Sequence, residues 1–144
     1  MTPKELRSKV AAAIAACEAK KAENVTVLEM DRATPSFTDY FVIVTGSNPR
    51  QMQAISDEVE QRLSKLGLRP AHVEGYNQAD WVLLDYVDFV VHIFSEKARH
   101  YYDLERLWKS AKRLQPAELT KARKATATRA RTASSRRPRR RTRS

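Results

Sequence analysis

The stretch from residue 81 to residue 94, WVLLDYVDFVVHIF, constrains the fold more than any other part of the chain. It holds two runs rich in β-branched and aromatic residues, 81–86 and 89–94, which predict a two-stranded hairpin with a tight turn at residues 87–88. In a sheet with one exposed face, strands alternate apolar with polar residues, but here the residues at both alternating sets of positions are apolar. We therefore expect this hairpin to lie inside a sheet covered on both faces, by helices of the same chain or by a partner's surface.

Capping signals mark the predicted helices. Residues 2–5, Thr-Pro-Lys-Glu, form a capping box with proline at the first helical position, and residues 48–51, Asn-Pro-Arg-Gln, repeat the arrangement. Apolar residues then recur at helical spacing, to about Lys21 in the first segment and to Gly67 in the second. Ser95 caps a third helix that Pro116 ends, with a predicted inward stripe of Tyr101, Leu104, Leu107, Trp108 and Ala111.

Short runs at residues 25–30, 38–45 and 69–76 fit three further strands. The element order is then α-β-β-α-β-β-β-α, with three helices and a mixed sheet of about five strands. This order predicts an α/β fold of the α+β-like kind, built on one core. A chain of 144 residues is long enough for one such domain but not for two.

Charge divides the chain near residue 115. The formal net charge is +10, and residues 115–144 hold 11 of the 27 Lys and Arg residues but one of the 17 Asp and Glu residues. The preceding 114 residues are therefore neutral. Beyond Pro116 the aromatic residues vanish, and Leu119 is the one large aliphatic residue. We expect a folded domain at residues 1–114 and a disordered, basic tail at residues 115–144.

Composition excludes several classes of protein. A single cysteine, Cys17, rules out an intramolecular disulfide framework and a cysteine-based zinc cluster. No run approaches the roughly 18 apolar residues of a membrane span. The Ala-rich start is short and flanked by Glu5 and Glu18, which favours an amphipathic helix over a signal peptide. We therefore expect a cytoplasmic protein without a membrane partner.

One enzymatic alternative has to be weighed. Thr45-Gly46-Ser47 precedes a capped helix, whose N-terminus could bind phosphate, and nucleotidyltransferases pair such a Gly-Ser with an Asp-x-Asp that holds metal ions. The nearest candidates, Asp85 and Asp88, have the spacing Asp-x-x-Asp, which points them to opposite faces of a strand. Strand ends and turns recruit these residue types in any case. The alternative function is a nucleotidyltransferase-like enzyme acting at Ser47, Asp85 and Asp88.

The histidines add no catalytic signal. His72, His92 and His100 show no metal-ligand spacing, and the chain contains no Ser-His-Asp, Cys-His or glycine-rich phosphate motif. His92 alternates inside an apolar strand, which favours a hydrogen-bonded core histidine over a base. We therefore predict a protein without catalytic activity, cofactor or metal ion.

The basic tail suggests contact with RNA. Its arginines are densest at the end, and arginine side chains contact phosphates without reading sequence. A second alternative function is therefore a general RNA-binding protein that acts through the tail alone, and the other interpretation of the tail is a solubilising extension. The residues predicted to contact nucleic acid are Arg136, Arg137, Arg139, Arg140 and Arg141.

Several segments, weak one by one, are specific as a set. They are TDYFVI at 38–43, TGS at 45–47, EG at 74–75, DWVLLDY at 80–86, VHIF at 91–94 and RHYYDLERLW at 99–108. Through them the chain resembles the ribosomal silencing factor family, also called Iojap-related proteins. The resemblance covers most of residues 3–114 and does not reach the tail.

The resemblance implies a function. Such a protein is a translational repressor that binds the large ribosomal subunit through its ribosomal protein fourteen, next to the contacts with the small subunit. Occupying that surface blocks subunit joining when nutrients are short. The resemblance also implies a fold similar to that of nucleotidyltransferases, without catalytic activity.

A docking surface follows from the hairpin and the resemblance together. If the helices leave part of the sheet uncovered, an apolar face carrying Trp81 and Leu83 suits a basic ribosomal protein, although Trp81 can equally be a core tryptophan. Tyr102 is the better surface candidate of the two adjacent tyrosines, and an uncovered face also favours a homodimer of the free protein. The tail would add contacts with ribosomal RNA. The acidic rim of the predicted surface is Glu74, Asp80 and Asp85.

Overall fold

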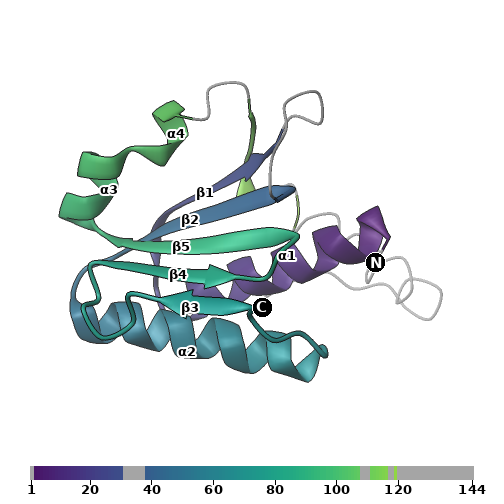
Figure 1. The fold of residues 1–144 in the computed structure, drawn as a ribbon, viewed down its shortest axis with the longest axis horizontal. Coiled ribbons are helices and arrows are strands. Elements are labelled where there is room, and N and C mark those ends of the chain that lie inside the picture. The colour runs from purple at the N-terminus through teal and green to yellow at the C-terminus, as the bar shows by residue number, and fades with distance from the viewer. Residues whose placement is uncertain (1, 31–37, 108–110, 117–118, 120–144) are drawn as a thin grey trace, which may run out of the picture.

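The computed structural model describes residues 2–30, 38–107, 111–116 and 119. Helices and strands follow the predicted order over most of the chain (Figure 1). The elements are α1 (Pro3–Ala19), β1 (Glu23–Glu29), β2 (Tyr40–Gly46), α2 (Pro49–Lys65), β3 (His72–Glu74), β4 (Trp81–Asp85), β5 (Phe89–Ser95), α3 (Glu96–Tyr102), α4 (Leu104–Leu107) and β6 (Lys112–Leu114).

The strands form one mixed sheet in the order β3-β4-β5-β2-β1-β6. Strands β2 and β5 are parallel, and the other neighbours are antiparallel. The predicted hairpin is β4 and β5, and Val87 in its turn has a positive φ of 74°. The prediction of a mixed α+β fold is confirmed, and β5 lies inside the sheet as expected.

Helices α1 and α2 pack side by side on one face of the sheet, which we call the sealed face (Figure 1). Both helices begin at the predicted caps: Thr2 Oγ1 accepts a hydrogen bond from the Glu5 amide at 3.1 Å, and Asn48 Oδ1 accepts one from the Gln51 amide at 2.8 Å. The sheet residues beneath these helices are fully buried; they are Val42, Val44, Val82, Leu84, Val91 and Ile93.

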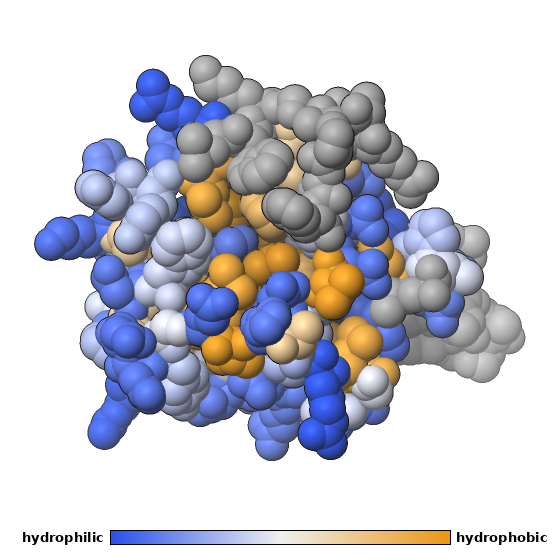
Figure 2. Space-filling model, in the orientation of Figure 1, coloured by the Kyte–Doolittle hydropathy of each residue, from blue (hydrophilic) through white to orange (hydrophobic). Residues whose placement is uncertain are grey.

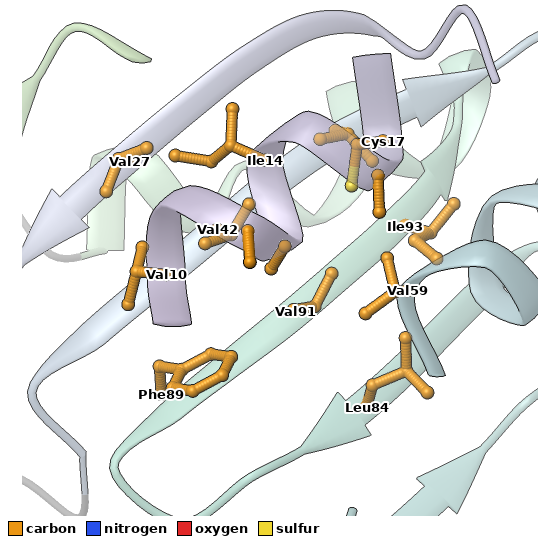
Figure 3. Packing of buried hydrophobic residues seen from close by; sticks show 14 of the residues in the cluster. Val10, Ile14, Cys17, Val27, Val42, Val59, Leu84, Phe89, Val91 and Ile93 are labelled. Atoms are coloured by element: carbon orange, nitrogen blue, oxygen red, sulfur yellow. The ribbon is translucent and has the colours of Figure 1, made fainter. Parts of the chain in front are cut away.

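Helix α1 buries its apolar stripe in the core of the sealed face. Val10, Ile14 and Cys17 of α1 share one buried cluster with Val42 and Val91 of the sheet (Figure 3). Burial raises the pKa of the Cys17 thiol to about 12, so the group remains neutral at physiological pH. Cys17 is therefore a small apolar residue of the core.

The opposite face of the sheet has a smaller cover. Helix α3 starts directly after β5 and packs across β5 and β2, where Ala98 joins a second buried cluster with Ile43 and Phe94. The Arg99 guanidinium fastens the helix to the sheet. It donates hydrogen bonds to the Asn24 carbonyl, to Thr45 Oγ1 at 3.0 Å and to Thr26 Oγ1 at 2.9 Å.

The prediction of one long last helix was wrong. Asp103 adopts the left-handed conformation with φ 44°, which aspartate tolerates better than most residues, and α3 ends there. After the single turn α4, strand β6 pairs with β1 and places Leu114, 2% exposed, in the core of the sealed face. The sheet therefore has six strands instead of about five.

The inward stripe predicted for that helix is correspondingly only half right. Tyr101 is 78% exposed, which contradicts its predicted burial, because α3 turns Ala98 and Tyr102 toward the sheet instead. Leu104 is buried and Ala111 packs against the second cluster, as expected. Trp108 and the tail arginines, Arg136, Arg137, Arg139, Arg140 and Arg141, lie outside the described residues.

Across the described part of the chain, none of the helices has both the length and the apolar character that a membrane span requires.

Candidate partner-binding surface

Strand β4 presents different residues to the two faces of the sheet. Val82 and Leu84 are buried against the helices of the sealed face, whereas Trp81, Leu83 and Asp85 are half-buried on the other face. This alternation follows from the period of two along a strand. The apolar residues at the two alternating sets of positions therefore face different environments. One set packs against the helices, and the other lies on a partly exposed surface.

Strand register joins these residues to neighbours on the same face. Glu74 lies opposite Leu83, which lies opposite His92, and Asp85 lies opposite Val90. Val90 in turn lies opposite Phe41 of β2. Helix α3 leaves this part of the sheet partly exposed, and we call it the open face; its residues are Phe41, Glu74, Trp81, Leu83, Asp85 and Val90.

The open face has an apolar centre. Figure 2 shows hydrophobic residues gathered in the middle of the view, over the area where Figure 1 draws β2, β5 and β4, with hydrophilic residues around them. Phe41, Trp81 and Leu83 are each half-buried, so each still offers apolar area to another molecule. An apolar patch with a polar rim is typical of a protein interaction site.

Trp81 is held in an aromatic cluster at one end of this face. Its ring lies 4.6 Å from that of Tyr102 and 5.0 Å from that of Phe94, measured between centroids. Its indole N–H donates a hydrogen bond to Nδ1 of His92 at 3.0 Å. Tyr102, 41% exposed, covers part of the tryptophan from α3. The two aromatic residues predicted for the surface are therefore neighbours in space.

The three predicted rim carboxylates differ in the hydrogen bonds that they accept. Glu74 is exposed on the edge strand β3. Asp80 is also exposed, but its Oδ1 accepts a hydrogen bond from the Ser95 hydroxyl at 2.6 Å, next to the start of α3. Asp85 Oδ1 accepts one from the Val87 amide at 2.8 Å and so orders the hairpin turn. Glu74 and Asp85 border the apolar centre, while Asp80 mainly supports the junction of β4 with α3.

The residues of the enzymatic alternative do not form one site. Ser47 follows β2 at the end where Gly46 pairs with Ser95, whereas Asp88 precedes β5 at its opposite end. Seven residues of strand separate these ends, about 20 Å at 3.3 Å per residue. The start of α2 is also occupied, since Gln51 Oε1 accepts hydrogen bonds from the amide and the hydroxyl of Ser47 at 2.6 and 2.8 Å. Among the described residues there is no cluster of three potential metal ligands.

A shallow cavity of about 230 Å³ lies elsewhere, near the start of α1. Two of its lining residues are hydrogen-bonded to each other: the Tyr40 hydroxyl donates to Glu29 at 3.2 Å, and it also accepts from Arg7 at 3.4 Å. Burial and the Glu29 carboxylate raise the pKa of Tyr40. None of the residues predicted for partner binding lines this cavity.

Sequence reasoning missed two residues of the open face, and it predicted His92 as a hydrogen-bonded core histidine without its place beside Trp81. Phe41 and Val90 reach it from β2 and β5, and His92 lies beneath Trp81. Their strands were predicted, but their position beside Trp81 depends on the order of strands in the sheet. A parallel β2–β5 pair with β4 on the other side of β5 is a non-local feature that the sequence pattern does not encode.

The fold and the open face together define a class of protein, namely mixed α/β domains with one sheet face sealed by two helices and the other left half covered. A crystal structure of a protein from Chromobacterium violaceum shares this fold, with a TM-score of 0.69 and 31% sequence identity over 76% of this chain and 88% of that one. The family model described as "Ribosomal silencing factor during starvation" matches residues 3–142. The chain belongs to this ribosomal silencing factor family.

Individual relatives agree with this assignment. The ribosomal silencing factor of Bacillus subtilis is 40% identical over 99 residues, which cover 69% of this chain and 83% of that protein. The mouse protein named "Mitochondrial assembly of ribosomal large subunit protein 1" is 32% identical over 75 residues, half of this chain and 33% of that protein. The family match continues beyond residue 114, where the sequence analysis places the end of the resemblance.

Proposed function

We propose that this protein binds the large ribosomal subunit through its open face and prevents the two ribosomal subunits from joining when nutrients are short. The family description supports a role in silencing ribosomes during starvation. The name of the mouse relative supports the large subunit as the partner. The repression is steric, because occupying the contact surface is enough and no reaction is needed.

We infer further that the protein contacted is ribosomal protein fourteen of the large subunit, and that binding takes place in the cytoplasm. Ribosomal proteins are commonly basic because they bind RNA. The carboxylates of Glu74 and Asp85 beside an apolar centre suit such a partner, since opposite charges at a rim guide association and fix orientation. Tight binding of the isolated ribosomal protein, in competition with intact large subunits, would support this assignment.

The observation that carries the proposal is the half-exposed Trp81 in the middle of its aromatic cluster. Tryptophan is enriched among the few interface residues that dominate binding energy, because it buries a large rigid area at small entropic cost. The side chain is already ordered by its contacts with Phe94 and Tyr102 and by its hydrogen bond to His92, so little freedom remains to be lost on binding.

The test is the affinity of the Trp81→Ala variant for purified large subunits. We expect a loss of at least about 30-fold, which corresponds to about 2 kcal/mol. Leu66→Ala is the control, because it removes a 41% exposed apolar residue at the end of α2, away from the open face, and it should change affinity less than twofold. A folded Trp81→Ala variant that binds with parental affinity would show that the open face is not the docking surface.

The tail gives a second, independent contribution under this proposal, by contacting ribosomal RNA. The binding constant of the tail should fall steeply with salt. A plot of its logarithm against the logarithm of the salt concentration should have a slope of about −0.9 for each phosphate neutralised. Deleting residues 120–144, which keeps the buried Leu119, should therefore flatten the salt dependence of subunit binding. If affinity and slope stay the same, the tail does not contact RNA. If the tail alone binds ribosomes as well as the whole chain does, the protein is instead a general RNA binder.

We also propose that two free copies associate through their open faces, since the apolar centre is otherwise in water. Dimerisation would then compete with ribosome binding, and Trp81→Ala should weaken both.

The nucleotidyltransferase alternative can be tested separately, since it requires binding of a nucleotide with Mg²⁺. Titration calorimetry with nucleotide and Mg²⁺ should detect no heat of binding, and a clear signal would revive the enzymatic alternative.

A further inference from the structure

His92 occupies an unusual position in the apolar interior beneath the open face. It lies in the middle of β5, is 4% exposed, and packs against the ring of Phe41 at 4.7 Å in an edge-on arrangement. Its Nδ1 accepts the indole N–H of Trp81 at 3.0 Å. Its Nε2 is buried and has no hydrogen-bond partner among the described residues. One nitrogen of the ring is therefore used and the other is not.

The protonation state of His92 follows from this environment. Burial lowers its pKa to about 4, so the ring is neutral at pH 7. Because Nδ1 accepts a hydrogen bond from Trp81, the proton of the neutral ring resides on Nε2. The unpartnered atom is therefore an N–H donor in an apolar setting, which is an unfavourable arrangement for the folded protein.

A buried polar group without a full set of partners requires an explanation. A leucine or methionine at position 92 would fill similar space among Phe41, Trp81 and Phe94 and would bring no buried donor of its own. Folding therefore gains little from a histidine here. What the histidine supplies and an aliphatic side chain does not is an acceptor aimed at the indole N–H of Trp81.

We propose that His92 is a positioning residue of the docking surface, which holds the Trp81 indole in the single orientation that the ribosomal partner recognises. This inference rests on the proposed function. Tyr102 and Phe94 restrict the tryptophan from its sides, and the hydrogen bond to Nδ1 decides which edge of the indole points inward. The polar edge is thereby satisfied within the protein, and the apolar part of the ring remains available for contact.

Loss of the acceptor should have a defined consequence. The Trp81 N–H would turn to water, and the side chain would populate several rotamers that must be ordered again on binding. Ordering one such side chain corresponds to about a 3- to 10-fold loss of affinity. The fold need not suffer, because the substitution also removes the unpaired N–H. Stability and affinity should thus change in opposite directions, which a merely structural residue would not produce.

The experiment compares His92→Leu with His92→Asn in the full chain. Asparagine places Oδ1 close to the position of Nδ1 and keeps an acceptor for the indole, whereas leucine removes it. We expect His92→Leu to bind large subunits 3- to 10-fold more weakly, with an unchanged or higher midpoint of thermal unfolding. His92→Asn should bind within twofold of the parent. Parental affinity of His92→Leu, or equal weakening in both variants, would overturn the inference.

A spectroscopic signature reports the orientation directly. The chain has two tryptophans, Trp81 and Trp108, so a ¹H–¹⁵N spectrum should show two indole N–H signals, which Trp108→Phe would assign. The Trp81 signal should exchange slowly with water in the parent and in His92→Asn, and quickly in His92→Leu. Slow exchange in all three proteins would show that His92 does not position the ring. If His92→Leu fails to fold, His92→Gln replaces it, because its longer side chain carries the amide away from the position of Nδ1.

Failure of this inference can be told apart from failure of the proposed function. If Trp81→Ala binds like the parent, the docking surface itself is wrong. If Trp81→Ala loses binding while His92→Leu does not, the docking surface is supported and the positioning role of His92 is wrong.

Discussion

The two faces of the sheet are made of similar residues but meet different surroundings. On the sealed face, α1 and α2 bury the valine, leucine and isoleucine side chains of the central strands completely. On the other face, α3 spans seven residues and covers one end of the sheet, across β5 and β2, so Phe41, Trp81 and Leu83 remain half-buried. The difference teaches that apolar composition in a strand does not by itself identify a core, because it equally serves an interface that a partner completes.

The largest difference in stability between the two faces should appear when neighbouring leucines on opposite faces are truncated. Leu84 is fully buried on the sealed face, whereas Leu83 is half-buried on the open face. We expect Leu84→Ala to lower the free energy of unfolding by about 2–5 kcal/mol, because it leaves a cavity in a packed core. Leu83→Ala should cost less than about 1 kcal/mol, since water already reaches part of that side chain. Urea denaturation of both variants measures the contrast.

Subunit binding supplies the control for this pair. Leu83→Ala should weaken binding to the large subunit while the folded population is intact, and Leu84→Ala should bind normally under conditions in which it is folded. Equal destabilisation by both truncations would show that the two faces are buried alike, and the comparison would fail.

The pH dependence of stability should identify the buried histidine of the open face. His92 has a pKa of about 4 when folded and an ordinary value of 6.5 when unfolded, and the rings packed around it, Phe41, Trp81 and Phe94, carry no charge. Between these pH values the unfolded chain binds the additional proton, so stability falls as the pH falls. The contribution of neutral His92 to the free energy of unfolding is intact above pH 6.5 and is lost by about pH 4. Its total is about 3 kcal/mol.

His92→Asn isolates this effect from the titration of the carboxylates, because asparagine does not titrate. The difference in unfolding free energy between parent and variant should change across this window and be constant above it. A constant difference from pH 7 to pH 4 would mean that the histidine is not held neutral.

The cover of the second face should depend on Arg99. Its guanidinium binds Asn24, Thr26 and Thr45 and so connects α3 to β1 and β2. We expect Arg99→Met to lower the free energy of unfolding by about 1.5–3 kcal/mol, the range for hydrogen bonds that involve a charged group. Amide hydrogen exchange in α3 should accelerate more than in α1 or α2. Arg99→Lys is the control, and it should recover little, because an ammonium does not reproduce the planar fork of the guanidinium.

Much of the fold could be predicted from local signals. The capping residues Thr2 and Asn48 fixed the starts of α1 and α2, and the two apolar phases of residues 81–94 identified the central hairpin. Such features depend on neighbours within a few residues, so the sequence contains them directly. The proposed anchor Trp81 was accessible for the same reason, since it begins a strand after a polar turn.

What the sequence did not reveal depends on contacts between distant segments. The last helix was extended through Asp103 because the apolar spacing continued, but burial of Leu114 beside β1 favours a sixth strand there. The hydrogen bond between Trp81 and His92 requires knowledge that β4 and β5 pair in one particular register. Sequence patterns report which residues avoid water, while strand pairing decides which of them meet.

The smallest effect should come from the rim of the open face. Glu74→Gln and Asp85→Asn each remove one charge, and asparagine keeps the oxygen that accepts the Val87 amide, so the hairpin turn is preserved. We expect each variant to slow association with the large subunit about two- to fivefold at low salt, with little change in dissociation, because rim charges act mainly during encounter. The difference should shrink as salt shortens the range of electrostatic attraction to about 3 Å at 1 M. Glu18→Gln, an exposed position on α1 at the sealed side, is the matched control and should leave the association rate unchanged. If Glu18→Gln slows association as much as Glu74→Gln does, the attraction belongs to the charge of the whole domain, and the acidic rim has no special part in choosing a basic partner.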